Sequence, residues 1–428
     1  MTNNNGSSVG SSVRTEIEAE LRRLTAVWFP LSVDRQHGGF LCDFDYRWKL
    51  RGTNDKLLDY QARQTIAAAR AAAHCPDMPL LRETALHGFA YLREKMWDHS
   101  LGGWYRLLSR SGDALEDSTK HGHGTAYAIS ACAACFDATG DAQCLELAKR
   151  AFHWLEQHAH DAQHGGYFVF YARNGTPILS VEQTHPPRAD RRDAIGTPIG
   201  CKDANTNSDL LKGFVDLYRV WPDPLLRQRL EELLCIVRDR LVVVPGLMHM
   251  YANPDWTPLP DVVRYGQILR SAIILLAASE SLFGELDATT ERIAKSMVDT
   301  MLRIAWDPER GGFHLAGSSL GPLRLEDTVV FVRDKVWWAQ ADGLRALLAM
   351  AARHPDDPID YASQFQRLWQ YARKYVIDAK RGGWLSAGLD TNPKADRGPK
   401  ASAWKDASHE VEALLDCLMM FERTQAGR

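Results

Sequence analysis

A seven-residue pattern occurs five times in this chain and limits how the chain can fold. Each copy has an aspartate, three further residues, two glycines and an aromatic residue. The copies are DRQHGGF at 34, DHSLGGW at 98, DAQHGGY at 161, DPERGGF at 307 and DAKRGGW at 378. Paired glycines permit a tight turn with positive φ, and the aromatic residue fits the start of a short strand. The pattern therefore predicts a repeated turn whose aspartates are structural.

The segments between these turns have helical periodicity and come in pairs. The expected helices are 14–29; 54–75 with 79–97; 119–138 with 141–158; 205–221 with 224–242; 264–284 with 287–305; 335–354 with 358–377; and 403–423. Connectors within a pair are short, whereas those between pairs are long and carry the turns. One long connector, PGLMHMYANPDW at 245–256, stands in the place of a missing copy. Six helical hairpins predict an all-α fold, a closed (α/α)6 barrel with alternate helices inside.

The repeat extends over nearly the entire chain, so we expect one catalytic barrel domain over 14–428 after a disordered polar tail over 1–13. The tail lacks the apolar core of a signal peptide, and no apolar run approaches membrane-spanning length. We therefore expect a cytoplasmic protein, monomer or homodimer, without a membrane partner. The net charge of -3 argues against a nucleic-acid partner. The eight cysteines lack disulfide-framework spacing, and Cys132 and Cys135 are expected to be buried thiols.

All long connectors leave an outer helix and enter an inner one, so the N-terminal ends of the inner helices share one rim. Each of these ends carries polar or aromatic side chains, which we expect to surround one mouth. They are Arg63; His121 and His123; Asn205 and Asp209; Gln267 and Arg270; Trp337, Trp338 and Gln340; and His409. Aromatic rings beside charged groups suit a small carbohydrate, whose C–H faces stack on rings while its hydroxyls need donors and acceptors. Lys120 and Lys405 are expected to be solvated.

Four segments resemble the N-acylglucosamine 2-epimerase superfamily, and most closely its cellobiose 2-epimerase and mannose isomerase branch. The segments are NTNSDLLKGFVDLYRVWPD at 205, YANPDWTPLPDVVRYGQ at 251, KVWWAQAD at 335 and AWKDASHE at 403. The resemblance covers about residues 15–423. It implies an (α/α)6 barrel that performs sugar 2-epimerisation or aldose–ketose isomerisation without a metal or redox cofactor. In that chemistry, histidines on opposite sides of an opened sugar move the C2 proton through a cis-enediolate.

Five residues match the family's functional positions. Arg63 matches the arginine that would bind and polarise the sugar oxygens, and Asn205 matches an asparagine of the site. Trp338 and Trp404 match its sugar-stacking tryptophans. His409 matches the C-terminal catalytic histidine, and we expect it to be the acid–base group.

Four further positions depart from the family. Asp209 and Gln267 stand where the family has histidines, Arg270 where it has a glutamate, and His123 where it usually has a tyrosine. A side-chain amide has no useful acid–base pKa near neutrality, so Gln267 is expected to bind substrate only. We expect Asp209 and His123 to orient the substrate or serve as auxiliary acid. His249, in the fourth long connector, is the nearby histidine that would replace the missing base.

The exchange of glutamate for Arg270 adds a positive charge beside Arg63, with Lys202 near them. Guanidinium groups favour bidentate binding of carboxylate, phosphate or sulfonate, so we expect the sugar to carry an acid group. The long segment 181–204 is rich in arginine and precedes the helix of Asn205. It is either a lid over the mouth or an inert surface loop.

Three functions fit the residues. The first is a sugar isomerase or epimerase with His409 as acid–base group. The second is a lyase or hydrolase of acidic or unsaturated sugars on the same barrel, with Asp209 as its carboxylic acid. The third is a non-catalytic sugar binder. Within the first, the lost second base favours isomerisation, or elimination from the same intermediate, over 2-epimerisation. A metal site made by His123, Asp209 and His409 is not expected.

Overall fold

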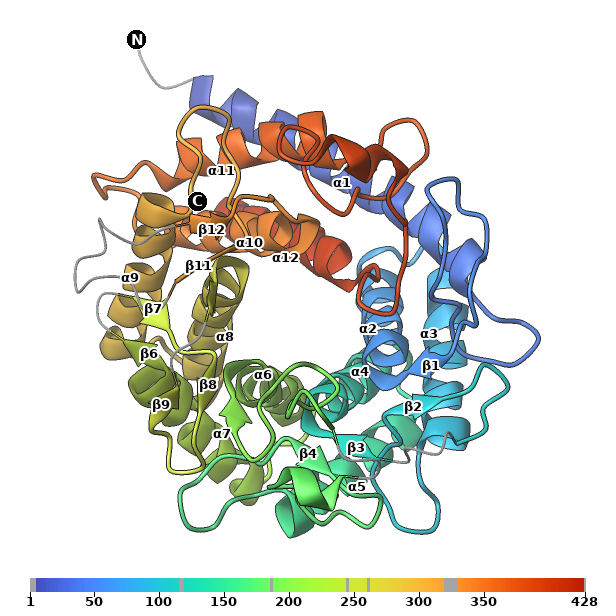
Figure 1. The fold of residues 1–428 in the computed structure, drawn as a ribbon. Coiled ribbons are helices and arrows are strands. Elements are labelled where there is room, and N and C mark those ends of the chain that lie inside the picture. The colour runs from blue at the N-terminus through green and yellow to red at the C-terminus, as the bar shows by residue number, and fades with distance from the viewer. Residues whose placement is uncertain are drawn as a thin grey trace.

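Twelve α-helices in the described part of the chain form two concentric rings (Figure 1). The structure is a computed structural model, which describes residues 5–114, 119–184, 188–243, 246–259, 262–318 and 330–426. The inner helices are α2 (Leu58–His74), α4 (Gly122–Thr139), α6 (Ala204–Val220), α8 (Tyr265–Phe283), α10 (Trp337–Arg353) and α12 (Ser408–Ala426). The outer helices are α1 (Asn5–Ser32), α3 (Pro79–Tyr91), α5 (Ala142–His158), α7 (Pro224–Ile236), α9 (Ala288–Ile304) and α11 (Tyr361–Tyr371). Each inner helix packs against the next, and α12 packs against α2, so the ring closes. The predicted (α/α)6 barrel is confirmed.

Short antiparallel strands and turns of helix occupy the long connectors. The strand groups are β1 (Lys56–Leu57) with β2 (Leu107–Leu108); β3 (Lys120–His121) with β4 (Phe170–Tyr171); β5 (Lys202–Asp203) with β8 (Tyr251–Ala252) and β9 (Pro258–Leu259); β6 (Val242–Val243) with β7 (Leu247–Met248); and β10 (Val262–Arg264) with β11 (Ala316–Ser318) and β12 (Val330–Val332). Wide helical turns end three outer helices, at Leu92–Met96, Val237–Leu241 and Ala372–Val376, and 3-10 turns lie at Val181–Gln183 and Pro393–Arg397. The strands tie each connector to its neighbour at one rim.

Inner and outer helices differ in how many of their faces are buried. In α4 every residue from Gly122 to Cys135 is buried, whereas the outer helix α9 buries one stripe. The inner helix α8 has 19 residues and a mean hydropathy of 1.3, enough by length and composition to span a membrane. The expectation that no apolar run approaches this length is therefore wrong for α8. An inner barrel helix needs apolar side chains on almost every face, and 72% of this stretch is buried in the protein.

The first helix is longer than the sequence predicted. α1 begins at Asn5 rather than at 14, so it includes residues 5–13 of the expected polar tail. Residues 1–4 lie outside the described part. Extending an established helix adds one hydrogen bond per residue, and the penalty for serine or asparagine is modest. A helix that is packed from Val13 onward therefore propagates backward through a polar stretch.

A buried lysine closes each of the five glycine turns. The five aspartates accept backbone N–H bonds from their own turns and pair with lysines that are at most 1% exposed. The pairs are Asp34–Lys56 at 2.9 Å, Asp98–Lys120 at 3.3 Å, Asp161–Lys202 at 2.7 Å, Asp307–Lys335 at 2.7 Å and Asp378–Lys400 at 2.6 Å. Each ammonium also donates to a carbonyl of the turn. The aspartates are structural, as predicted.

Two lysines expected to be solvated are buried instead. Lys120 is 0% exposed and Lys405 is 2% exposed. Burying an ammonium is costly unless a carboxylate and carbonyl oxygens replace its water, and Lys120 has all of these partners. Lys405 lies near Glu410 and over the rings of Trp28 and Trp337. Lys120 could not be placed from sequence, because its partners come from other turns, and Lys405 could not, because its environment includes the distant rings of Trp28 and Trp337.

We expect the turn pair Asp161–Lys202 to contribute strongly to stability. Replacing Lys202 by methionine leaves Asp161 buried without its cation, which lowers the free energy of unfolding by about 3–5 kcal/mol. Lys380 lies in the fifth turn but is exposed, so Lys380→Met is the matched control and changes stability by less than about 0.5 kcal/mol. Urea denaturation measures both values. Equal stability of the two variants would show that the turn does not depend on its buried pair.

Candidate active site

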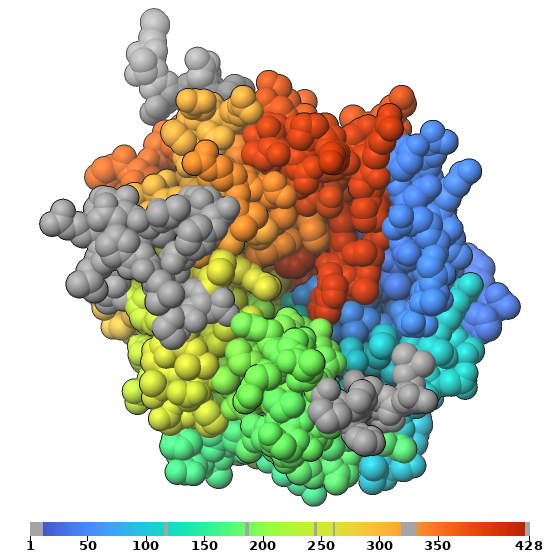
Figure 2. Space-filling view, viewed as in Figure 1, coloured from blue at the N-terminus to red at the C-terminus, as the bar shows by residue number. Residues whose placement is uncertain are grey.

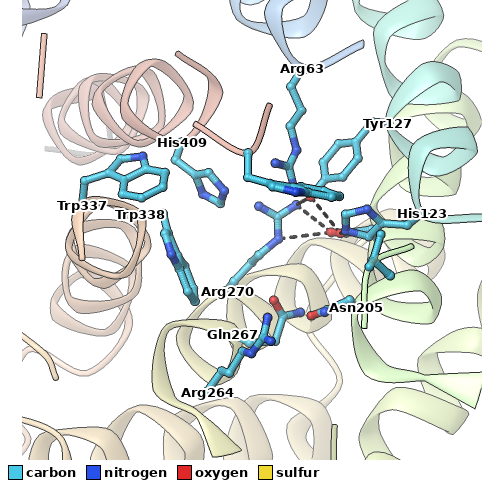
Figure 3. Close-up of a pocket in the computed structure, with 13 residues that line it drawn as sticks. Arg63, His123, Tyr127, Asn205, Arg264, Gln267, Arg270, Trp337, Trp338 and His409 are labelled. Atoms are coloured by element: carbon cyan, nitrogen blue, oxygen red, sulfur yellow. Dashed lines mark hydrogen bonds and ion pairs between the residues drawn. The ribbon is translucent and has the colours of Figure 1, made fainter. Parts of the chain in front are cut away.

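A pocket of about 310 Å³ opens at the rim that carries the five turns. Figure 2 shows the corresponding hollow at the centre of this face, bordered by the C-terminal segment and the middle of the chain. All predicted site residues except His121, His249 and Gln340 line the pocket. Tyr127, Ile195 and Arg264 also line it and were missed from sequence. The shared rim predicted from the connector lengths therefore exists and brings side chains from all six inner helices together (Figure 3).

Asp209 is the centre of a buried cluster of charges on one side of the pocket. Its Oδ1 accepts from Arg270 Nη2 at 2.6 Å and Nε at 3.1 Å, and its Oδ2 accepts from the Tyr127 hydroxyl at 2.8 Å. His123 Nε2 lies 3.2 Å from the same Oδ2. Burial alone would raise the pKa of Asp209, but Arg270 and His123 hold it well below its usual range. Asp209 is therefore an anion at every pH near neutrality.

His123 lies between two carboxylates. Its Nδ1 bonds Asp59 and its Nε2 faces Asp209. Burial alone would lower the pKa of His123, yet Asp59 and Asp209 together raise it to about 9. The side chain is therefore an imidazolium at neutral pH, with both of its N–H groups engaged. This state can supply a proton but cannot remove one.

Tyr127 joins the two arginines of the pocket. Its hydroxyl oxygen accepts from Arg63 Nη2 at 2.8 Å and from Arg270 Nη2 at 3.1 Å, while its proton is donated to Asp209. The Arg63 guanidinium also lies 4.2 Å from the centre of the Tyr127 ring. In sequence Tyr127 is embedded in the small-residue helix GHGTAYAISACAACF. Its position four residues after His123, on the same face of α4, is the signal that could have revealed it.

The guanidinium of Arg63 has an N–H group that no described residue accepts. Its Nη1 lies 3.5 Å from Asp406 Oδ2, and its Nε is buried without a hydrogen-bond partner in the described part of the chain. An unsatisfied buried N–H is costly, because the group has lost its water. A substrate oxygen that reaches this N–H would satisfy it. The arrangement supports the expected role of Arg63 in binding sugar oxygens.

His409 and Asp342 form a dyad on the other side of the pocket. His409 Nδ1 lies 3.1 Å from Asp342 Oδ2, and Arg345 donates to the second oxygen of Asp342 at 3.1 Å. A carboxylate only accepts, so the proton of a neutral His409 is on Nδ1 and Nε2 carries a lone pair. No described residue bonds Nε2. The ring of Trp338 stands 5.9 Å from His409, and Trp404 is 43% exposed at the mouth.

Three residues predicted at the mouth lie elsewhere. Gln340 is fully buried and exchanges two 2.8 Å bonds with the backbone of Phe313, so it holds the fourth turn and does not reach the pocket. His249 is half-buried on the connector between β7 and β8 and is not part of the lining. His121 accepts the N–H of His123 and bonds Asp193 at 2.9 Å. A polar side chain near a helix start caps backbone as readily as it meets a ligand, and sequence does not distinguish the two.

The segment 181–204 reaches the pocket through Ile195. Asp193, two residues earlier, is buried and bonded to His121, and it accepts from the backbone of Ile195 and Thr197. The segment is therefore fixed to the rim next to the mouth, with residues 185–187 outside the described part. Its role as a moving lid stays a prediction.

The positive charges differ in how they are compensated. Arg63, Arg270 and His123 face the carboxylates of Asp406, Asp209 and Asp59 in three separate pairs. Lys202 is buried against Asp161. The expectation that Arg270 and Lys202 offer free charge to an acidic sugar is therefore wrong. Arg264 is exposed, lines the pocket and pairs with no carboxylate of a described residue. Among the described residues no group of three or more His, Cys, Asp or Glu side chains could hold a metal ion.

The charge of His123 can be tested by titration. Replacing Asp59 by asparagine removes one of its two carboxylates, so the pKa of His123 falls from about 9 by about 1–3 units. Because the pKa is raised in the folded state, the stability contributed by His123 is complete below its unfolded value and is lost as pH rises through 9. Imidazole ¹H–¹⁵N NMR measures the titration directly. Asp55→Asn, at the same rim but without contact to His123, is the control, and equal titrations in both variants would contradict the pairing.

The chain is similar to known proteins in both sequence and structure. A family model described as N-acylglucosamine 2-epimerase matches residues 38–174 and 201–405. The chain is 23% identical to a cellobiose 2-epimerase of Bacteroides fragilis over 95% of this chain and 98% of that protein. It is also 23% identical to a D-mannose isomerase of Marinomonas mediterranea over 95% and 97% of the two chains. The solved cellobiose 2-epimerase of Spirochaeta thermophila superposes with a TM-score of 0.86 at 23% identity, over 99% of this chain and 100% of that one.

Proposed function

The chain belongs to the N-acylglucosamine 2-epimerase family and is a sugar epimerase or isomerase, and from this premise we propose that it interconverts an aldose and a ketose with His409 as the base. The observation that carries the proposal is the His409–Asp342 dyad, whose Nε2 has no partner among the described residues. Asp342 fixes the ring and favours the imidazolium that forms when Nε2 takes a proton. A histidine held in this way suits removal of the C2 proton of an opened sugar.

The groups facing His409 favour isomerisation over 2-epimerisation. Inverting C2 requires a second group that can exchange a proton with carbon on the opposite face. Gln267 has no acid–base chemistry near neutrality. The pKa of Asp209 is held well below its usual range, and His123 is already protonated. His409 alone can take the C2 proton and return it to C1 on the same face, which converts an aldose into a ketose.

The two arginines stabilise the intermediate in this proposal. Removing the C2 proton places negative charge on the cis oxygens O1 and O2 of an enediolate. Arg63 and Arg270 converge on one point beside the pocket, at the Tyr127 hydroxyl. Preorganised donors in a site that excludes water are the strongest contribution that such a pocket makes to catalysis. Trp338 and Trp404 offer apolar faces for the rest of the sugar.

The alternative functions fit the geometry less well. A hydrolase would need Asp209 as a protonated acid, but its neighbours keep the pKa of that carboxyl low. A binder without catalysis has no use for a histidine whose Nδ1 is fixed by a buried carboxylate. Elimination from the same enediolate uses the same groups as isomerisation, and the product of the reaction distinguishes the two.

We also propose that the sugar carries an acid group and that Arg264, rather than Arg270, binds this group. Arg264 is the last residue of β10 and lies directly before α8, at the mouth of the pocket. A guanidinium without a carboxylate partner binds carboxylate, phosphate or sulfonate groups through paired hydrogen bonds. The sugar would then lie with C1 and C2 between His409 and the arginine pair and its acid group toward Arg264.

The base is tested in heavy water with a panel of neutral and acidic aldoses. We expect the wild type to form ketose and to place deuterium at C1 and C2, because the proton on His409 Nε2 exchanges with solvent. His409→Gln should lose both activities completely. His249→Gln is the matched control and should keep turnover within about threefold, because His249 does not line the pocket. Sustained interconversion of C2 epimers without ketose would overturn the proposed reaction.

The acid group is tested by comparing two substrates in one variant. Arg264→Gln should raise KM for an acidic aldose by about 10- to 100-fold, since a hydrogen bond to a charged group contributes about 1.5–3 kcal/mol. The same variant should leave KM for the matching neutral aldose unchanged. Arg292→Gln, on the outer helix α9, is the control for loss of a surface charge. An equal change in KM for the two substrates would show that Arg264 does not bind the acid group.

A further inference from the structure

Converting an aldose into a ketose requires two proton movements. One proton moves from C2 to C1, and His409 provides for that step in the proposed function. A second proton must leave the O2 hydroxyl, which becomes a carbonyl, and another must reach O1, which becomes a hydroxyl. His409 cannot serve both steps at once, because it holds the carbon-derived proton while the enediolate exists.

The oxygens of the intermediate would lie next to one buried hydroxyl. Arg63 and Arg270 both donate to the Tyr127 oxygen, at 2.8 Å and 3.1 Å. Both guanidiniums line the pocket, and their remaining N–H groups are the donors available to sugar oxygens. Any oxygen bound by these guanidiniums is therefore a neighbour of the phenol. Figure 3 shows Arg63, Tyr127 and His123 gathered on the side of the pocket away from His409 and Trp338.

We propose that Tyr127 is the second catalytic residue of this pocket and carries the proton between O2 and O1 of the enediolate. The assignment rests on the proposed function. In the step, the phenolic O–H bond breaks as the O1–H bond forms, and the phenolate oxygen then takes the proton of O2. Tyr127 ends the cycle as it began, and C1 receives its hydrogen from His409. No oxidant, reductant or co-reactant is needed.

The hydrogen bonds around Tyr127 permit this step. In the structure its proton points to Asp209 Oδ2 at 2.8 Å, and turning the O–H bond about the Cζ–O axis redirects it to a substrate oxygen. Asp209 does not lose its place, since Arg270 holds it with two bonds and His123 faces it at 3.2 Å. A transient phenolate would be stabilised by the two guanidiniums that already bond its oxygen.

The acidity of a buried phenol suits protons on oxygen. Burial raises the pKa of Tyr127 above its usual value, although Arg270 and Arg63 oppose the rise. Such a phenol is a poor base toward a C–H bond at neutral pH. Sugar hydroxyls also ionise only in alkaline solution, and transfer between groups of similar pKa has little thermodynamic cost. Asp209, with its low pKa, is badly matched to the same task.

The test separates the two proton movements in heavy water. For an aldose that the wild type converts, NMR follows deuterium entry at C2 of the recovered aldose and formation of ketose. Tyr127→Phe keeps the ring under Arg63 and removes the hydroxyl. We expect ketose formation to fall by about 10²–10⁴-fold, while C2 exchange falls much less, so that the ratio of exchange to turnover rises at least tenfold. Tyr265→Phe removes a buried hydroxyl that has no hydrogen-bond partner in the described part, and this control should leave both rates unchanged.

Each of the following outcomes would overturn the assignment. If Tyr127→Phe lowers exchange and turnover equally, the hydroxyl only bridges the arginines, and if both rates stay at wild-type values it has no role. If the wild type exchanges no C2 proton, or His409→Gln exchanges it as well as the wild type does, the proposed function fails and this assignment with it. Should Tyr127→Phe not fold, replacement of Tyr127 by 3,5-difluorotyrosine retains the hydrogen bonds and makes the phenol more acidic. The alkaline limb of kcat should then move to lower pH, and an unmoved limb would exclude Tyr127.

Discussion

A lysine ammonium buried against an aspartate is the interaction on which the active-site rim depends. An ammonium without water is stable in a protein interior only when carboxylate and carbonyl oxygens replace its hydration shell. The turns provide this shell: Lys335, for example, bonds Asp307, Asp390 and the carbonyl of Gly311. In four connectors the lysine lies two residues before an inner helix, so the pair fixes where that helix begins. Before α8 the equivalent residue is Val263, and the same connector lacks the glycine turn. The connector before α8 thus lacks both the turn aspartate and the lysine, as expected if the two residues function only as a pair.

The rim in turn determines which side chains can meet. Inner helices that start at a fixed height present their first two turns to one mouth, and residues from α2, α4, α6, α8, α10 and α12 meet there. The same helix starts also need caps and turn supports. Gln340 and its counterpart Gln61 on α2 bond the aromatic residue of a glycine turn through both backbone groups. Polar residues at the start of an inner helix therefore divide into those that build the rim and those that face the substrate.

Sequence alone predicted the barrel, the pairing of helices and most of the lining, because connector length and helical periodicity are local properties. The sequence did not show that Gln340 supports a turn whereas His409 lines the pocket. That difference depends on where each side chain points relative to a turn from another repeat. Tyr127 was missed because its small apolar neighbours indicated a buried structural helix. The buried lysines were missed because one lysine looks like any other until its carboxylate is known. The positive charge of Arg270 was predicted, but the sequence did not show that Asp209, from the neighbouring helix α6, neutralises it.

The cluster around Asp209 argues that the departures from the family pattern are a coordinated change. The resemblance places a histidine at position 209 and a glutamate at 270, where this chain has an aspartate and an arginine, so the two positions still carry groups of opposite sign in hydrogen-bond contact. His123 replaces a tyrosine and adds a cation on the second oxygen of Asp209. Tyr127 supplies a phenol one helical turn further along the same face of α4. Independent loss of catalytic residues would leave buried charges without partners, at a cost of several kcal/mol for each. Here every charge in the cluster faces an opposite one, as a coordinated exchange of residues requires, and the proposed base His409 lies with Asp342 on the other side of the pocket.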